Sequence, residues 1–191
     1  MQASDLLVQC LEREGIEYIF GVPGEENADF MMSLEKSDQI RFVLTRHEQG
    51  AAFMAEIYGR LTGNPAGCLG TLGPGATNLI TGVADGNMDR APMLVLTGQG
   101  ETSRLNKESH QVMDVVAMFE PVTKWAESIR HPDTIPEVVR KAVRIARSEK
   151  PGAVHIELAE DVAKMETSAT PIEPLRYRRA VPDDKIVDAA Y

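Results

Sequence analysis

The feature that most constrains the fold is a regular alternation of short apolar runs with longer segments of helical periodicity. The segment from Ala3 to Glu14 places apolar residues at helical spacing, and similar patterns recur along the chain. Strands that alternate with helices form βαβ units and therefore parallel sheets. We predict an α/β fold: a three-layer, doubly wound sheet of about six mainly parallel strands, with helices on both faces. The predicted strands are Tyr18 to Gly21, Phe42 to Thr45, Ala66 to Thr71, Met93 to Thr97, Val122 to Ala126 and Ala153 to Leu158.

Charge and composition exclude several classes of partner. The 191 residues carry a net charge of −9, which disfavours nucleic acid and anionic membranes, because phosphate groups are bound by clustered Lys and Arg. The sequence contains no apolar run of about 18 residues and no basic-then-apolar start, so we expect a cytoplasmic protein with no membrane partner. Cys10 and Cys68 lack the spacing of a zinc site and are predicted to be small buried apolar residues.

The character of the sequence changes near its carboxyl end. Residues 1–165 are predicted to form one domain, since the alternation of strands and helices continues to that point. The polar, proline-bearing stretch that follows is typical of a linker, and residues 183–191 begin a new helical pattern. We therefore interpret residues 166–191 as a linker and the start of a truncated central domain.

Three predicted loops lie after strands and so meet at one edge of a parallel sheet, where α/β proteins bind ligands. They are residues 18–27, the polar cluster Arg46-His47-Glu48, and residues 72–78. Glu48 begins a predicted helix, so its carboxylate could simply stabilise the positive end of the helix dipole. Alternatively, it is a functional acid at the ligand edge.

Glycine-rich turns after strands also occur in nucleotide-binding modules, which are an alternative reading of the same loops. However, the sequence contains neither G-x-G-x-x-G nor G-x-x-x-x-G-K-[ST], the two specific phosphate-binding patterns. A long segment without clear periodicity, Glu101 to Asp114, is predicted to be a surface loop. Long loops in compact domains often carry functional residues.

Four motifs occur in a specific order: GVPG at residues 21–24, RHEQGAAFMAE at 46–56, LGPGATNLITG at 72–82 and HQVMDVVAMFEPVTKWA at 110–126. Together they resemble the pyrimidine-binding domain of the acetolactate synthase family of thiamine-diphosphate enzymes. The resemblance extends from Ala3 to about Val162. The last motif is most similar to catabolic acetolactate synthases.

The resemblance implies roles for individual residues. Glu48 would be catalytic, by contacting the ring nitrogen of the cofactor's aminopyrimidine and sharing a proton with it. Gln111 would be the second catalytic group, on the substrate side beside His110. The residues implied to line the pocket of thiamine diphosphate, together with Glu48, are Pro23, Gly24, Pro74 and Asn78.

The resemblance also implies an activity for the full-length protein: condensation of two 2-oxo acids, pyruvate first, with loss of CO2. Family members hold the diphosphate and Mg²⁺ in a separate domain, so no metal site is expected here, and Asp85-Gly86-Asn87 is assigned to a helix terminus. The full-length protein would be a homodimer or tetramer, with FAD as a possible further cofactor. The fragment alone is expected to be inactive.

One departure from the family pattern lies on the expected substrate side. Glu25 and Glu26 follow the Pro-Gly turn, where two acids disfavour an anionic 2-oxo acid. Either they point away from the pocket, for instance by capping the next helix, or the substrate differs. Two alternatives therefore stay open: another thiamine-diphosphate-dependent decarboxylase or lyase, acting on a different 2-oxo acid or an acyl-CoA, and a noncatalytic binding or regulatory module of the same fold.

Overall fold

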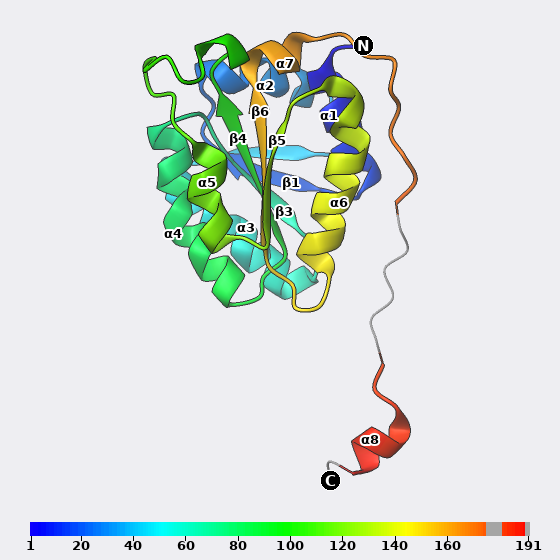
Figure 1. The fold of residues 1–191 in the computed structure, drawn as a ribbon. Coiled ribbons are helices and arrows are strands. Elements are labelled where there is room, and N and C mark those ends of the chain that lie inside the picture. Colours follow the sequence, from blue (N-terminus) through cyan, green and yellow to red (C-terminus); the bar gives the residue numbers. More distant parts are fainter. Residues whose placement is uncertain (175–180, 190–191) are drawn as a thin grey trace.

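A computed structural model of the chain describes residues 1–174 and 181–189. Its sheet has six strands, all parallel, in the order β2-β1-β3-β4-β6-β5 (Figure 1). The prediction of a doubly wound α/β sheet is confirmed. The strands are β1 (Tyr18–Gly21), β2 (Arg41–Leu44), β3 (Ala66–Gly70), β4 (Met93–Gln99), β5 (Trp125–Ile129) and β6 (Ala153–Ala159).

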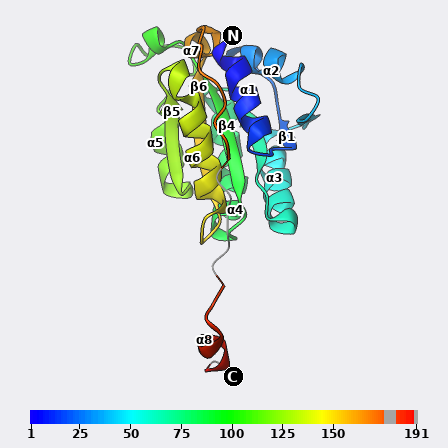
Figure 2. The ribbon, with the colours of Figure 1, turned by 90° about the vertical axis from the view of Figure 1, so that its right-hand side faces the viewer.

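Helices cover both faces of the sheet, which gives the three layers (Figures 1 and 2). One face carries α1 (Ala3–Arg13), α2 (Ala28–Leu34), α6 (Ile135–Arg147) and α7 (Glu160–Lys164). The other face carries α3 (Glu48–Thr62), α4 (Pro74–Met88) and α5 (Val115–Phe119). Near the carboxyl end of the sequence lies α8 (Asp184–Asp188). Short 3₁₀ helices span Glu25–Asn27, Thr102–Arg104, Glu120–Val122 and Pro132–Thr134.

The position of β5 differs from the prediction by three residues. The apolar start of the predicted strand, Val122, instead ends a 3₁₀ helix that contains Pro121. Pairing with β6 begins only when the Lys124 N–H donates to the Ala153 carbonyl, at 2.8 Å. Because β5 is an edge strand with mostly half-buried residues, its sequence lacks the continuous apolar run that marks the central strands.

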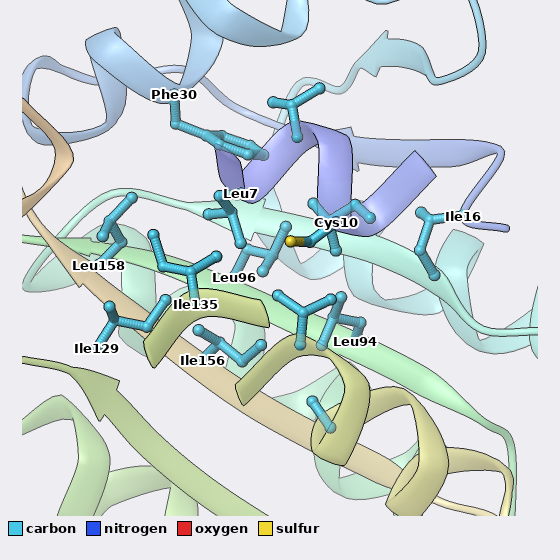
Figure 3. Close-up of a cluster of buried hydrophobic side chains, with 14 of the residues drawn as sticks. Leu7, Cys10, Ile16, Phe30, Leu94, Leu96, Ile129, Ile135, Ile156 and Leu158 are labelled. Atoms are coloured by element: carbon cyan, nitrogen blue, oxygen red, sulfur yellow. The ribbon is translucent and has the colours of Figure 1, made fainter. Parts of the chain in front are cut away.

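The first core lies between the sheet and the α1, α2, α6 and α7 layer. Figure 3 shows side chains from both helical and strand elements meeting there, among them Leu7 and Cys10 from α1, Phe30 from α2 and Ile135 from α6. Cys10 is buried and forms no disulfide, as predicted. Burial raises the pKa of its thiol to about 12, which keeps it protonated and unreactive.

The second core, beneath α3 and α4, is built from small residues. A Cβ added at Gly82 of α4 would lie 2.7 Å from the Ala52 Cβ of α3, and one at Gly59 of α3 would lie 2.2 Å from the Pro92 carbonyl oxygen. Only hydrogen fits at these two points, so α3 packs directly on its neighbours. Cys68 is buried in the same core, as predicted. The Asp85-Gly86-Asn87 segment falls in the last turn of α4, which confirms its assignment to a helix terminus.

Four buried polar residues of β4 and β6 interrupt the second core: Thr97, Gln99, His155 and Glu157. The Thr97 hydroxyl and His155 Nε2 lie 2.8 Å apart and form a hydrogen bond. The His155 ring stacks on Phe119 of α5, with centroids 4.3 Å apart. His155 Nδ1 has no partner within the described residues. Within the described residues, His155 is therefore hydrogen-bonded at one ring nitrogen only.

Acid should destabilise the protein through His155. Burial lowers its pKa from 6.5 to about 3, so between those values the unfolded chain binds the extra proton. Stability is then complete above pH 6.5 and falls as the pH is lowered, by roughly 1.4 kcal/mol at pH 5.5 for one such group. Urea unfolding at pH 7.5 and 5.5 should show this loss in the parent protein but not in His155→Gln. Equal losses in both proteins would contradict the assignment.

Beyond residue 165 the chain still contacts the domain. Glu166 forms an isolated antiparallel bridge with Gln2, and the Thr167 N–H donates to the Met1 carbonyl at 2.9 Å. Part of the predicted linker, residues 175–180, lies outside the described residues. Over the described ranges, no helix has the length and apolar character needed to cross a membrane.

Candidate functional site

The three predicted loops lie at one edge of the sheet. Gly21 of β1 pairs with Leu44 of β2 on one side and with Leu69 of β3 on the other. The three neighbouring strands therefore end at nearly the same level. The turns that follow them converge because all three strands run in the same direction.

Glu48 is the first residue of α3, and its carboxylate points into the site rather than into solvent. The side chain is only 8% exposed. Asn78 of α4 donates from Nδ2 to Glu48 Oε2 at 2.9 Å. One amide of the helix start has another partner, since His47 caps α3 by accepting a hydrogen bond from the Gln49 N–H at its Nδ1. Glu48 is thus fixed by a residue implied to line the same pocket.

Thr71 lies between the two Pro-Gly turns and brings them together. A Cβ added at Gly24 would lie 2.6 Å from the Thr71 Cβ, and one at Gly75 would lie 2.8 Å from Thr71 Cγ2. The same added atom at Gly75 would lie 3.4 Å from Glu48 Oε1. Gly24 and Gly75 therefore let both turns pack closely on Thr71, and we call this cluster beside the carboxylate the cradle. The prolines that precede them, Pro23 and Pro74, are exposed at its rim.

Glu25 and Glu26 form the start of a 3₁₀ helix, but neither carboxylate supplies the cap. Asn27 does so instead, because its Oδ1 accepts a hydrogen bond from the Gly24 N–H at 2.9 Å. Glu26 Oε2 accepts from the Thr71 hydroxyl at 2.9 Å, whereas Glu25 is exposed. The capping expectation is wrong for both acids, since a shorter amide side chain three residues after Gly24 fits the turn better.

The segment between β4 and α5 is a long surface loop, as predicted, and extends beyond the end of the sheet in both ribbon views (Figures 1 and 2). Gln111 is exposed and has a φ of 58°, an uncommon conformation for a residue other than glycine. Its backbone packs against Gly73, where an added Cβ would lie 2.8 Å from the Gln111 carbonyl oxygen. His110 is also exposed, and its carbonyl accepts from Arg104 at 3.4 Å.

The structure brings Gly24, Glu48, Gly75 and Asn78 into one connected group and places Gln111 against the turn before Pro74. Sequence reasoning missed Thr71, which joins the two turns. The available signal was its position at the end of a buried strand, directly before a Gly-Pro-Gly turn. Within residues 1–174 and 181–189, no group of three or more His, Cys, Asp or Glu side chains is placed to hold a metal ion.

This fold and this edge of the sheet define a class of protein. Residues 1–118 match the family described as "Thiamine pyrophosphate enzyme, N-terminal TPP binding domain", and the chain belongs to that family. Within it, the chain is 42% identical over 166 residues to a probable acetolactate synthase large subunit from Methanococcus aeolicus, which covers 87% of this chain and 28% of the relative.

Two further relatives show how the similarity is distributed. The acetolactate synthase isozyme 1 large subunit of Escherichia coli K12 is 40% identical over 83% of this chain and 28% of its own length. The glyoxylate carboligase of Escherichia coli O157:H7 is 41% identical over 92% of this chain and 30% of its own length. The chain therefore spans less than a third of each of these relatives.

Proposed function

We propose that this chain provides the pyrimidine-binding half of a thiamine-diphosphate site in an acetolactate synthase-like enzyme, which condenses two 2-oxo acids with loss of CO2. The observation that carries the proposal is the Glu48 carboxylate, which is buried and hydrogen-bonded to Asn78. It lies at the edge of the sheet where ligands bind in open α/β folds.

The residues around Glu48 fit a flat heterocycle that carries a basic ring nitrogen. Among the described residues, hydrogen bonds to the carboxylate use only Oε2, so Oε1 is available to share a proton with such a nitrogen. Gly75 adds no side chain next to this oxygen, since a Cβ there would lie 3.4 Å from it, and Pro23 and Pro74 would contact the ring faces. Bound thiamine diphosphate supplies the electron sink for decarboxylation of a 2-oxo acid. Glu48 would hold the proton at the pyrimidine nitrogen, and Asn78 would orient Glu48.

The substrate would be met by residues on the other side of the same turns. Gln111 and His110 are exposed beside them, and we assign them to the substrate side together with Glu25 and Glu26. The Thr71 hydroxyl holds the Glu26 carboxylate at the cradle. A carboxylate there disfavours an anionic substrate that approaches closely, so Glu26 would contribute to selection between 2-oxo acids.

The remaining parts of the site would come from sequence outside this chain. We propose that another domain binds the diphosphate and Mg²⁺, that FAD is a possible further cofactor, and that the full-length protein is a homodimer or tetramer in the cytoplasm. Exposed apolar residues support a partner surface: α3 presents Met54, Ile57 and Leu61 to solvent on the face opposite its buried alanines. Contiguous exposed apolar residues of this kind are typical of interfaces.

A second candidate is condensation of glyoxylate rather than pyruvate. The glyoxylate carboligase relative covers 92% of this chain, more than the two acetolactate synthases described above. Glyoxylate is the smaller acid and lacks the methyl group of pyruvate. It would fit a site that Glu26 narrows.

Product analysis tests both candidates. The full-length protein, supplied with thiamine diphosphate and Mg²⁺, is expected to release CO2 from pyruvate and form acetolactate, which mass spectrometry identifies. A parallel reaction with glyoxylate measures the second candidate by kcat/KM, and Glu48→Gln serves as the control for both. If neither acid is decarboxylated, another substrate or the noncatalytic module is favoured.

A further inference from the structure

The side-chain amide of Gln99, at the end of β4, is fully used in hydrogen bonds. Its Nε2 donates to the Met113 carbonyl at 2.9 Å and to Glu157 Oε2 at 3.0 Å, while its Oε1 accepts from the Gly100 N–H at 3.0 Å. The side chain is 2% exposed. Two amide protons and one oxygen therefore fix its orientation completely.

Glu157 holds this amide from β6, the neighbouring strand. Burial raises the pKa of Glu157, an effect that the nearby Asp114 charge adds to, while hydrogen bonds from Ser128 and Gln99 oppose it. A buried carboxyl group requires such partners, because an unpaired one carries a large desolvation cost. Gln99 is consequently anchored in the sheet and cannot rotate away from the loop without costing Glu157 one of its hydrogen bonds.

The loop contact made by Gln99 lies close to the functional part of the loop. Met113 is two residues after Gln111, and the backbone of Gln111 itself presses on Gly73 of the β3–α4 turn. At the other end of the loop, Asp161 of α7 accepts hydrogen bonds from the Thr102 N–H and hydroxyl. Most residues between these two anchors are exposed, so the attachment points of the segment control where Gln111 lies.

We propose that Gln99, anchored by Glu157, is a positioning residue that holds the loop of residues 101–114 so that Gln111 faces the substrate side of the site. The role of Gln111 in this inference rests on the proposed function. The attachment of the loop by Gln99, which we call the tether, does not depend on that function. The competing explanation is that Gln99 and Glu157 merely satisfy each other inside the core.

One pair of substitutions separates these explanations. Gln99→Glu removes both amide donors and places a second carboxylate beside Glu157. Adding Glu157→Gln restores a carboxylate–amide pair in the core, but the Met113 carbonyl then faces a carboxylate and gains no donor. This swapped double variant should therefore recover much of the unfolding free energy that Gln99→Glu loses, while the loop still lacks its hydrogen bond at the Met113 carbonyl.

Limited proteolysis of the full-length protein measures how accessible the loop is to a protease, independently of any activity. Lys107 is exposed within it, and trypsin cleavage after this residue is followed by mass spectrometry. We expect faster cleavage in Gln99→Glu and in the swapped double variant than in the parent. Thr97→Val is the matched control: it breaks a buried hydrogen bond to β6 two residues away on the same strand, and cleavage after Lys107 should stay at the parent rate.

Kinetics then test whether the tether acts through Gln111. Misplacing a substrate-positioning group by about 1 Å costs up to roughly 100-fold in rate, so we expect Gln99→Glu to lower kcat/KM by at least about tenfold. Gln111→Ala should cost less in the Gln99→Glu background than in the parent, because coupled residues are not additive.

Three outcomes would overturn the proposal: unchanged cleavage in Gln99→Glu, restored loop protection in the swapped variant, or fully additive kinetic losses. A protein that decarboxylates no 2-oxo acid would remove the proposed function. The proteolysis result would still show whether Gln99 holds the loop.

Discussion

Replacing Glu48 with glutamine is expected to lower kcat of the proposed full-length enzyme by about 10²–10⁴-fold, the usual contribution of a positioned acid or base. An amide cannot share a proton with a ring nitrogen as a carboxyl group does. The hydrogen bond from Asn78 to Glu48 Oε2 could still form to the amide oxygen. Fold and cofactor affinity should therefore change little, as measured by circular dichroism and by titration with thiamine diphosphate.

The matched control is Glu56→Gln, in the same helix. Glu56 is also buried, and a glutamine there keeps a side-chain oxygen that can accept the hydrogen bond from Arg60. Glu56 bonds to Arg60 at 3.1 Å, away from the cradle, and kcat should remain close to that of the parent. Parent-like turnover in Glu48→Gln would remove Glu48 from the mechanism.

Replacing Gly59 with alanine should destabilise the protein by about 3 kcal/mol, near the upper end of the usual cost of overpacking. The added methyl group would lie 2.2 Å from the carbonyl oxygen of Pro92. That atom belongs to the backbone and cannot rotate aside as a side chain could. The free energy of unfolding in urea measures the loss.

Gly50→Ala provides the opposite result in the same helix. A Cβ at Gly50 meets nothing within 4 Å, so alanine should stabilise α3 by about 0.5–1 kcal/mol through its better helix propensity. If both substitutions shifted the free energy of unfolding in the same direction, the close contact of Gly59 with the Pro92 carbonyl would not be the cause.

The sequence was sufficient to predict the architecture because the central strands are short apolar runs between helical patterns. Ala66–Gly70 and Met93–Gln99, in which every residue is buried, are examples. Burial on both faces leaves little freedom in the sequence of such strands. The edge strand Trp125–Ile129 is only partly buried, and there the apolar pattern gave a start three residues too early.

The candidate site was less predictable because part of it depends on contacts between segments far apart in sequence. Glu48 and Asn78 were expected in one pocket, and their hydrogen bond joins residues 30 positions apart. Thr71 and Gln99 carry no motif of their own. Their roles arise from partners 45 and 58 residues away, Glu26 and Glu157, which only the folded chain identifies.

Thr71 also limits how such a site can diverge. One small side chain touches both glycines of the cradle and binds Glu26. The residues at positions 24, 26, 71 and 75 are therefore packed against one another, and the size of one limits the size of the others. A lineage that acquired a bulkier residue at position 71 would have to move both turns at once. Substrate preference is therefore expected to evolve here through linked replacements rather than independent single steps.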